Sequence, residues 1–214
     1  MFYLGAITLL LSVLLHFQKR VDFAIQSLFY RSGHWLIHTD QDALYFFLYT
    51  IPRAIPWIVG LAVLAKLFAL HRAGKSKANA YRALIFLGGL PLLTNSAKAV
   101  TGQACPNQFS DFAGALADET FYHAGARCFP GGHSSAGYAL LGLCFLASRP
   151  QTRKMTAAIA LIWGTVLATY QMARGLHFIS DGFATLGIAF ILYALLAKIP
   201  FEKKSFSETE GQIL

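Results

Sequence analysis

Long apolar segments follow one another along most of this chain and constrain its fold more than any other feature. They lie at about residues 2–17, 43–70, 82–101, 133–148, 155–174 and 178–197. About 20 helical residues cross the hydrocarbon core of a bilayer, where the backbone must satisfy its own hydrogen bonds. The first and fourth segments are short for this task. We predict an all-α, polytopic membrane protein with six transmembrane helices, built as a single domain over residues 1–214.

The composition agrees with a membrane location. Hydrophobic residues make up 56% of the chain and charged residues only 13%, whereas a soluble domain has about a quarter of its residues charged. The net charge of +8 is compatible with nucleic-acid binding, but the cations lie in short clusters between apolar segments. We therefore expect the lipid bilayer as partner and no nucleic acid. The oligomeric state stays open.

The basic residues also predict an orientation. Six spans put both termini on one side, and ten of the 18 Lys and Arg residues fall in clusters on that side. Cytoplasmic loops carry such an excess of Lys and Arg, so both termini are predicted to be cytoplasmic. Segments 18–42, 102–132 and 174–178 then face the other side. The clustered residues are Arg72, Lys75, Lys77, Arg82, Arg149, Arg153, Lys154, Lys198, Lys203 and Lys204.

Two polar segments are predicted to lie outside the bilayer. Residues 21–37 mix apolar, aromatic and polar side chains at near-helical spacing, which favours an interfacial helix. Residues 102–132 are polar and long, as in a functional loop or lid. Within the second span, Arg53 either extends to the interface or contacts an anionic headgroup.

The stretch from Cys128 to Leu140 contains a Pro-Gly-Gly-His turn that opens an apolar helix. We expect Ser134 or Ser135 to cap this helix. The first N–H groups of a helix and the positive end of its dipole attract anions. With His133 at the same place, the stretch favours a phosphate site that has a proton donor beside it.

A second motif follows in the stretch 171–181. Gln171, Arg174, His177 and Asp181 succeed one another at steps of three, three and four, so they share one helical face. A carboxylate one turn after a histidine holds the imidazole in one tautomer and makes it a better nucleophile or base. The motif therefore predicts a catalytic site.

Taken together, these motifs resemble the type 2 phosphatidic acid phosphatase superfamily of lipid phosphate phosphatases, in its membrane branch. The resemblance rests on Lys98 followed by Pro106, on Pro130 to His133, and on His177 with Asp181. It covers about residues 80–197, with the core motifs in 95–185. It implies metal-independent phosphatase chemistry without a cofactor.

The resemblance also assigns roles. His177 would attack phosphorus and form a phosphohistidine, Asp181 would orient it, and His133 would protonate the leaving oxygen. The phosphoryl oxygens would be bound by Lys98, Arg174, Gly131 and Gly132. We also include Arg127 and Gln171 among the expected phosphate-binding residues.

Three residues or pairs depart from the family pattern, and two of these departures remove a cation. Cys105 stands where the family has arginine before proline, Gly131 replaces a serine, and Tyr170-Gln171 replaces a Ser-Arg pair. Since Gln171 shares a helical face with Arg174, our hypothesis is that Arg174 reaches the same oxygen, and that Arg127 supplies the other charge. These changes resemble a bacterial subgroup that includes lipid A phosphatases.

If Lys98 and His133 meet at one phosphate, Cys105 and Cys128 lie at the ends of one non-cytoplasmic loop. We predict a disulfide between them, since a bacterial periplasm is oxidising; the alternative is two unrelated reduced thiols. The bond would close a loop of about 23 residues and stabilise the fold by about 3 kcal/mol in the chain-entropy treatment.

The leading functional hypothesis is hydrolysis of a lipid phosphate monoester or diphosphate at the periplasmic face of a bacterial inner membrane. Candidate substrates are lipid A, undecaprenyl diphosphate and phosphatidylglycerophosphate. The alternatives are a lipid phosphotransferase, a haem protein with His133 and His177 as axial ligands, and a metal site formed by His123, His133, His177 and Asp181.

Overall fold

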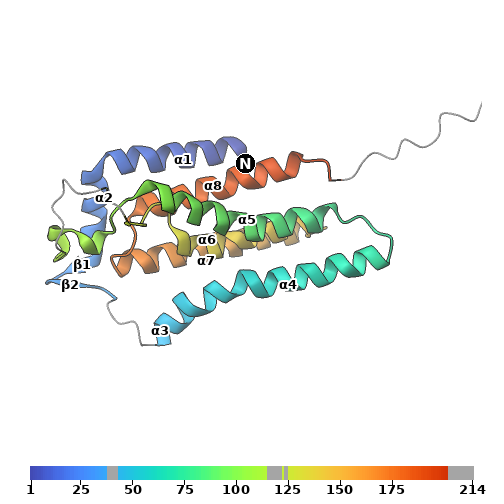
Figure 1. Cartoon of the computed structure of the whole chain (residues 1–214), viewed down its shortest axis with the longest axis horizontal. Helices are drawn as coiled ribbons and strands as arrows, with labels where there is room; N and C mark the ends of the chain where they lie inside the picture. The colour runs from blue at the N-terminus through green and yellow to red at the C-terminus, as the bar shows by residue number, and fades with distance from the viewer. Residues whose placement is uncertain (38–42, 115–121, 123–124, 202–214) are drawn as a thin grey trace, which may run out of the picture.

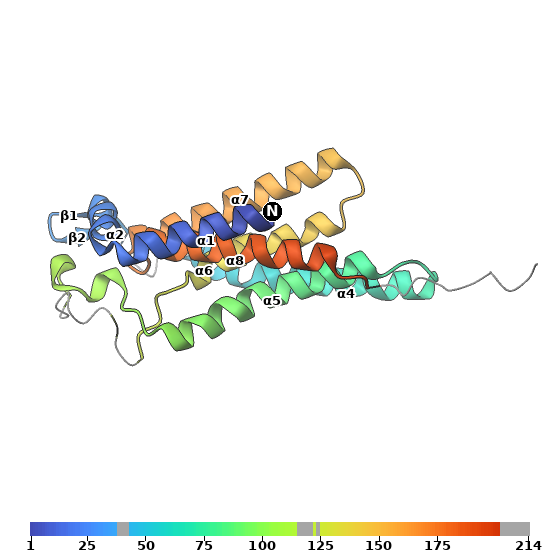
Figure 2. The same ribbon diagram turned by 90° about the horizontal axis from the view of Figure 1, so that it is seen from above.

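The computed structural model describes residues 1–37, 43–114, 122 and 125–201. The long helices run roughly along one common axis, and short elements gather at one end of the bundle (Figures 1 and 2). The predicted all-α membrane architecture is confirmed, and the six apolar segments are helical. The long helices are α1 (Phe2–Phe17), α4 (Ile51–Arg72), α5 (Ala78–Thr101), α7 (Pro150–Ala173) and α8 (Ile179–Lys198).

Among the described residues, four helices are long and apolar enough to cross a membrane: 43–72, 78–101, 150–173 and 179–198. The first joins α3 (Ala43–Tyr45), the π-helical turn η2 (Phe46–Thr50) and α4. A fifth span results if α1 and the segment 19–29, which meet at 88°, are counted as one. The fourth apolar segment forms α6 (Gly132–Tyr138) and the 3-10 helix η6 (Ala139–Phe145), of seven residues each. The count of six spans therefore stays a prediction.

The centre of the bundle is the α6–η6 segment, which packs against α5 and α7 (Figure 1). Its buried residues Tyr138 and Leu141 join Phe86, Leu90 and Phe190 in the main apolar core. Close packing of this kind holds membrane helices together, because lipid tails are as apolar as the side chains. A Cβ atom at Gly164 would lie 2.1 Å from the Tyr138 ring, so α7 needs glycine there.

Helix α1 lies antiparallel along α8, with small residues at the contact. A Cβ atom at Gly5 would lie 2.9 Å from the backbone nitrogen of Ile191. At the other end of α1, the Ser12 hydroxyl donates to the Ser180 carbonyl at 2.8 Å. Both contacts fix the position of α8, whose first turn carries Asp181.

The predicted interfacial helix over 21–37 is only partly correct. Helix α2 covers Lys19–Gln26 and continues as η1 (Ser27–Phe29), but a hairpin of β1 (Tyr30–Arg31) and β2 (His34–Trp35) follows. Ser32 and Gly33 have φ of +52° and +81°, as in the tight turns that favour hairpins. The helical segment ends at Phe29, where Tyr30 becomes extended, and the Ser-Gly turn two residues later reverses the chain. Apolar spacing alone does not predict this change.

The hairpin helps to hold the long connection between α5 and α6. Within this connection lie η3 (Pro106–Gln108) and η4 (Ser110–Phe112). Phe109, Phe112 and Phe178 are buried together, and Phe23, Tyr30 and Trp35 pack against them. This cluster attaches the connection to the start of α8, where the second motif lies.

The described parts of the connection between α5 and α6 (102–114, 122 and 125–131) and the segment 174–178 lie at one end of the bundle. The α4–α5 and η6–α7 connections lie at the opposite end (Figure 2). Lys198 reaches to 6.0 Å from the ring of Phe2, so the start of α1 and the end of α8 lie close together. The described members of the basic clusters are thus separated from the motif residues by the length of the bundle.

Candidate active site

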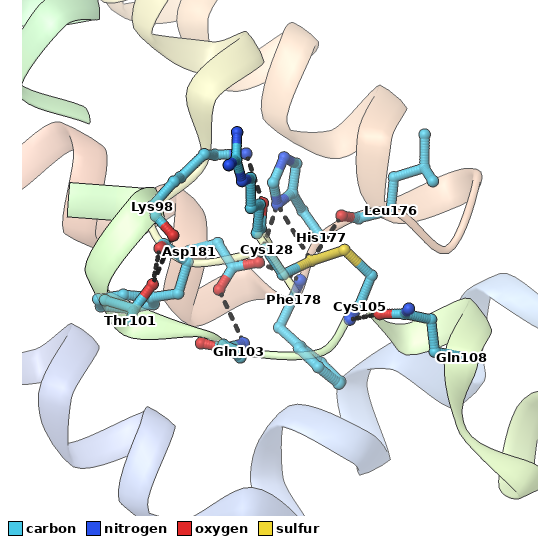
Figure 3. The surroundings of a disulfide bond; sticks show 12 residues. Lys98, Thr101, Gln103, Cys105, Gln108, Cys128, Leu176, His177, Phe178 and Asp181 are labelled. Carbon is cyan, nitrogen blue, oxygen red and sulfur yellow. Dashed lines mark hydrogen bonds and ion pairs between the residues drawn. A yellow bond between two sulfur atoms is a disulfide. The ribbon is translucent and has the colours of Figure 1, made fainter. Parts of the chain in front are cut away.

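His177 and Asp181 lie at the turn between α7 and α8. Gly175, with φ of +70°, lets the chain reverse after α7. Asp181 lies in the first turn of α8, where a carboxylate is stabilised by the helix dipole. Its Oδ2 accepts the Nδ1–H of His177 and the N–H of Phe178, both at 2.9 Å (Figure 3). The carboxylate is fully buried, so it is held in one orientation.

The surroundings of His177 favour a neutral imidazole. Burial is the main cause that lowers the pKa of His177, and the nearby Lys98 ammonium lowers it further, while Asp181 acts in the opposite direction. Because Nδ1–H donates to Asp181, Nε2 carries the lone pair. A neutral ring with its lone pair at Nε2 is the form that attacks an electrophile.

Gln103 is a site residue that the sequence analysis did not identify. Its side chain is fully buried, and Nε2 donates to Asp181 Oδ1 at 3.2 Å. Its backbone carbonyl accepts the N–H of Cys128 at 3.0 Å. A glutamine in a polar connection carries no sequence signal for this role, because the role depends on how the connection folds back.

The predicted disulfide between Cys105 and Cys128 is present, so the alternative of two reduced thiols is wrong. Their Cα atoms are 5.1 Å apart, and 23 positions separate them in sequence. The Cys128 sulfur lies 3.6 Å from His177 Nδ1 (Figure 3). The bond therefore attaches the connection directly beside the predicted nucleophile.

Lys98 lies in the last turn of α5 and points toward the start of α6. Its Nζ donates to the Arg127 carbonyl at 3.0 Å. A Cβ atom at Gly132 would lie 3.3 Å from the same Nζ, so glycine at 132 leaves room for the ammonium. The Arg127 side chain is exposed and lines the same cavity as Lys98.

The start of α6 differs from the expected arrangement. The N-cap residue is Gly131. Ser134 and Ser135 donate their hydroxyls to the carbonyls of Gly131 and Gly132, so the predicted serine cap is wrong. The N–H of Gly131 donates to the Asp181 carbonyl at 2.9 Å and is engaged within the protein. Phosphate binding by Gly132 stays a prediction.

His133 is held by the segment that precedes α4. Its Nε2 donates to the Leu48 carbonyl at 2.8 Å, and its ring stacks on Tyr49 with centroids 4.7 Å apart. Leu48 and Tyr49 belong to the π-helical turn η2, an irregularity that is frequent at functional sites.

Arg174 does not lie with the other cations that were predicted to bind phosphate. The Arg174 guanidinium lies over the rings of Tyr45, Tyr49 and Tyr170 at 5.1 to 5.5 Å, and Arg174 does not line the cavity that contains His177. Gln171 is buried and does line it. Phosphate binding by both residues stays a prediction.

Both predicted catalytic histidines line one large cavity. Its volume is about 1080 Å³, and it lies between α4 and α5. Its polar part contains His133, His177, Lys98, Arg127 and Arg53, so Arg53 lies where it can meet an anion. The rest of its wall is apolar and includes Trp57, Leu61, Leu64, Leu84, Leu87 and Leu92.

A group of donors suited to a metal also lies at the site. Within the described part of the chain, Cys128, His177 and Asp181 place their donor atoms within 4.8 Å of one another. Cys128 is in the disulfide, which removes its thiolate. His133 is outside this group, and His123 of the predicted metal set lies outside the described residues.

Comparisons with known proteins agree with this geometry. The chain is similar in structure to a transmembrane PAP2-type phosphatidylglycerolphosphate phosphatase from Bacillus subtilis, with a TM-score of 0.62 and 19% identity over 90% of this chain and 91% of that one. No curated protein matches the sequence. The family model of the PAP2 superfamily matches residues 79–205, which is more than half of the chain and includes both motifs. The chain belongs to the PAP2 superfamily.

Proposed function

We propose that this protein is a lipid phosphate phosphatase that hydrolyses a phosphate monoester or diphosphate on a membrane lipid. The observation that carries the proposal is the cavity between α4 and α5. At one end it exposes two histidines and three cations, and its remaining wall is apolar. A phosphate group fits the first part and a lipid chain fits the second.

In the proposed reaction, His177 Nε2 attacks phosphorus and forms a phosphohistidine. Asp181 stabilises the positive imidazole through Nδ1–H. His133 gives a proton to the leaving oxygen. Water then hydrolyses the intermediate and releases phosphate and His177, and solvent returns a proton to His133. Charge on the phosphoryl oxygens is met by Lys98 and Arg127, which are fixed donors in a partly dry site. No step requires a metal, so activity in EDTA is expected.

The site is proposed to face the periplasm of a bacterial inner membrane, with both termini in the cytoplasm. The described basic clusters lie at the far end of the bundle from the site, as the positive-inside rule predicts. A disulfide persists in an oxidising compartment. A membrane-impermeant thiol reagent tests the orientation in intact cells: Asp111→Cys should react, whereas Lys75→Cys should react only after lysis.

Phosphate release from a panel of lipids in detergent tests the activity. The panel contains lipid A, undecaprenyl diphosphate, phosphatidylglycerophosphate and phosphatidic acid. We expect release from at least one lipid by wild type, none by His177→Ala, and wild-type release by His71→Ala, because His71 is exposed at the far end of α4. No release from any lipid would contradict the proposal.

A phosphotransferase would use the same histidine, with a second lipid in place of water. The same assay separates the two activities when an acceptor lipid is added. Free phosphate that falls while phosphorylated acceptor rises would favour transfer over hydrolysis.

A further inference from the structure

The disulfide is positioned so that its loss would change the chemistry of the nucleophile. Cys128 is completely buried, whereas Cys105 and His177 both line the cavity. A small dithiol or phosphine reductant that enters the cavity therefore meets the Cys105 side of the bond first. Reduction takes two electrons from the reductant and leaves two thiols. Their two protons come from the dithiol or, with a phosphine, from the water that also supplies the oxygen of the phosphine oxide.

The reduced Cys128 would complete a set of three metal ligands. Its sulfur lies 3.6 Å from His177 Nδ1, and Nδ1 lies 2.9 Å from Asp181 Oδ2. Tetrahedral zinc, with bonds of about 2.0 to 2.3 Å, needs about 3.5 Å between sulfur and nitrogen and about 3.4 Å between nitrogen and oxygen. The first separation is met as it stands, and the second requires a shift of about 0.5 Å. The sulfur and the carboxylate oxygen lie within 4.8 Å of each other and must come to about 3.6 Å.

We propose that opening the Cys105–Cys128 bond creates an inhibitory zinc site from Cys128, His177 and Asp181. The Cys128 thiol loses one proton to solvent when it binds the metal. The neutral imidazole moves its hydrogen from Nδ1 to Nε2, because Nδ1 now binds zinc. Nε2 then has no lone pair for phosphorus, so the enzyme is inactive.

Only the inhibition by zinc rests on the proposed function, because it requires His177 as nucleophile. Metal binding itself does not depend on activity. In the oxidised protein the sulfur has no thiolate to offer, so the site exists only after reduction. A competing outcome for the reduced thiol is a hydrogen bond to the Leu176 carbonyl, which lies 2.8 Å from the sulfur.

Two single cysteine variants provide a matched test, both made in a Cys144→Ala background because Cys144 is a free cysteine. Cys105→Ser leaves the thiol at 128, beside His177. Cys128→Ser leaves the thiol at 105, which is not in the donor group. Each variant is assayed for phosphate release at buffered free Zn²⁺ and titrated with Co²⁺, which reports a thiolate ligand by a charge-transfer absorption band.

We expect Cys105→Ser to be inhibited at a free Zn²⁺ concentration at least about tenfold lower than Cys128→Ser, because it alone offers the soft sulfur ligand. Cys105→Ser should also show the Co²⁺ band, and the band should vanish when His177→Gln is added. If Cys105→Ser shows the Co²⁺ band but is not inhibited by zinc, the metal site is supported and the role of His177 as nucleophile is contradicted.

A second measurement keeps the test valid if a cysteine variant does not fold. It uses the Cys144→Ala protein with Cys105 and Cys128 intact, reduced by a phosphine and then desalted. This protein should gain the Co²⁺ band, and reoxidation should remove it. Equal zinc sensitivity of both variants together with no band in Cys105→Ser or in reduced wild type would overturn the proposal.

Discussion

His177 and His133 line one cavity but are held by different parts of the molecule. The His177 side chain donates a hydrogen bond to Asp181, a fully buried carboxylate at the start of α8. The His133 side chain donates a hydrogen bond to the Leu48 carbonyl and stacks on Tyr49, and both of these residues lie in η2. Helix α8 is well packed, whereas α4, which continues from η2, buries only Pro52 and Val63. The side chain of the predicted nucleophile is thus oriented by the core, whereas the ring of the predicted acid, although His133 itself lies in α6, is contacted by a peripheral segment.

This difference suits the different roles proposed for the two histidines. A nucleophile must be held within a fraction of an ångström of its reacting geometry, which a packed core provides. A helix with few buried residues moves more easily, so we expect α4 rather than the start of α8 to be the mobile side of the cavity.

The largest expected effect is a difference in kcat between variants of the two histidines, and this difference depends on the leaving group of the substrate. His177→Ala should lose at least about a thousandfold in kcat with every substrate, because no covalent intermediate forms. His133→Ala should lose about a hundredfold or more with a lipid phosphate but little with p-nitrophenyl phosphate, whose leaving group needs no proton. Similar losses of both variants with both substrates would mean that the roles are assigned wrongly.

The next effect concerns the support of His177. Asp181→Asn should lose about a hundredfold to ten-thousandfold in kcat, because the amide favours the wrong imidazole tautomer. Gln103→Leu removes a hydrogen-bond donor to the same carboxylate. Because a hydrogen bond to a charged group contributes about 1.5–3 kcal/mol, this variant should lose about tenfold to a hundredfold in kcat. Gln108→Leu, in the same connection, is the control and should stay within a few-fold of wild type. If it matches Gln103→Leu, the effect belongs to folding of the connection.

A smaller effect is a shift in pH dependence. Burial and Lys98 lower the pKa of His177, so its neutral form persists below the ordinary value of about 6.5. The acidic limb of kcat/KM should therefore lie below that pH. Lys98→Met removes a positive charge that lowers this pKa, so the limb should move to higher pH. A limb that moves to lower pH in this variant would contradict the assignment.

The smallest expected effect concerns the support of His133. Tyr49→Leu loses the aromatic stack, worth about 0.5–1.5 kcal/mol, and should slow lipid phosphate hydrolysis by about two- to tenfold. Tyr49→Phe keeps the ring and should behave like wild type. With p-nitrophenyl phosphate neither variant should be slow; a slow Tyr49→Leu there would point to a general disturbance of the site.

Residues with local spacing were the easiest to predict from sequence. The i, i+4 relation of His177 and Asp181 and the apolar segments follow from helical geometry, and the structure contains both. The disulfide followed from placing Lys98 and His133 at one site. Gln103 and the Leu48 carbonyl were missed because long-range folding brings them to the site.

The errors also have physical causes. Apolar spacing predicted a helix over 21–37, but the chain becomes extended at Tyr30 and reverses at a Ser-Gly turn. The N–H of Gly131 was assigned to phosphate because helix starts bind anions, but the first turn of α8 lies close enough for the Asp181 carbonyl to accept it.

Trapping the phosphoenzyme tests most directly whether His177 is the nucleophile. A lipid substrate with a labelled phosphoryl group is mixed with excess enzyme, quenched in alkali within a turnover, and the labelled peptide is mapped. We predict an acid-labile label on His177 in wild type and in His133→Ala, and no label in His177→Ala. A label on another residue, or an unlabelled wild type that still releases phosphate, would contradict the account.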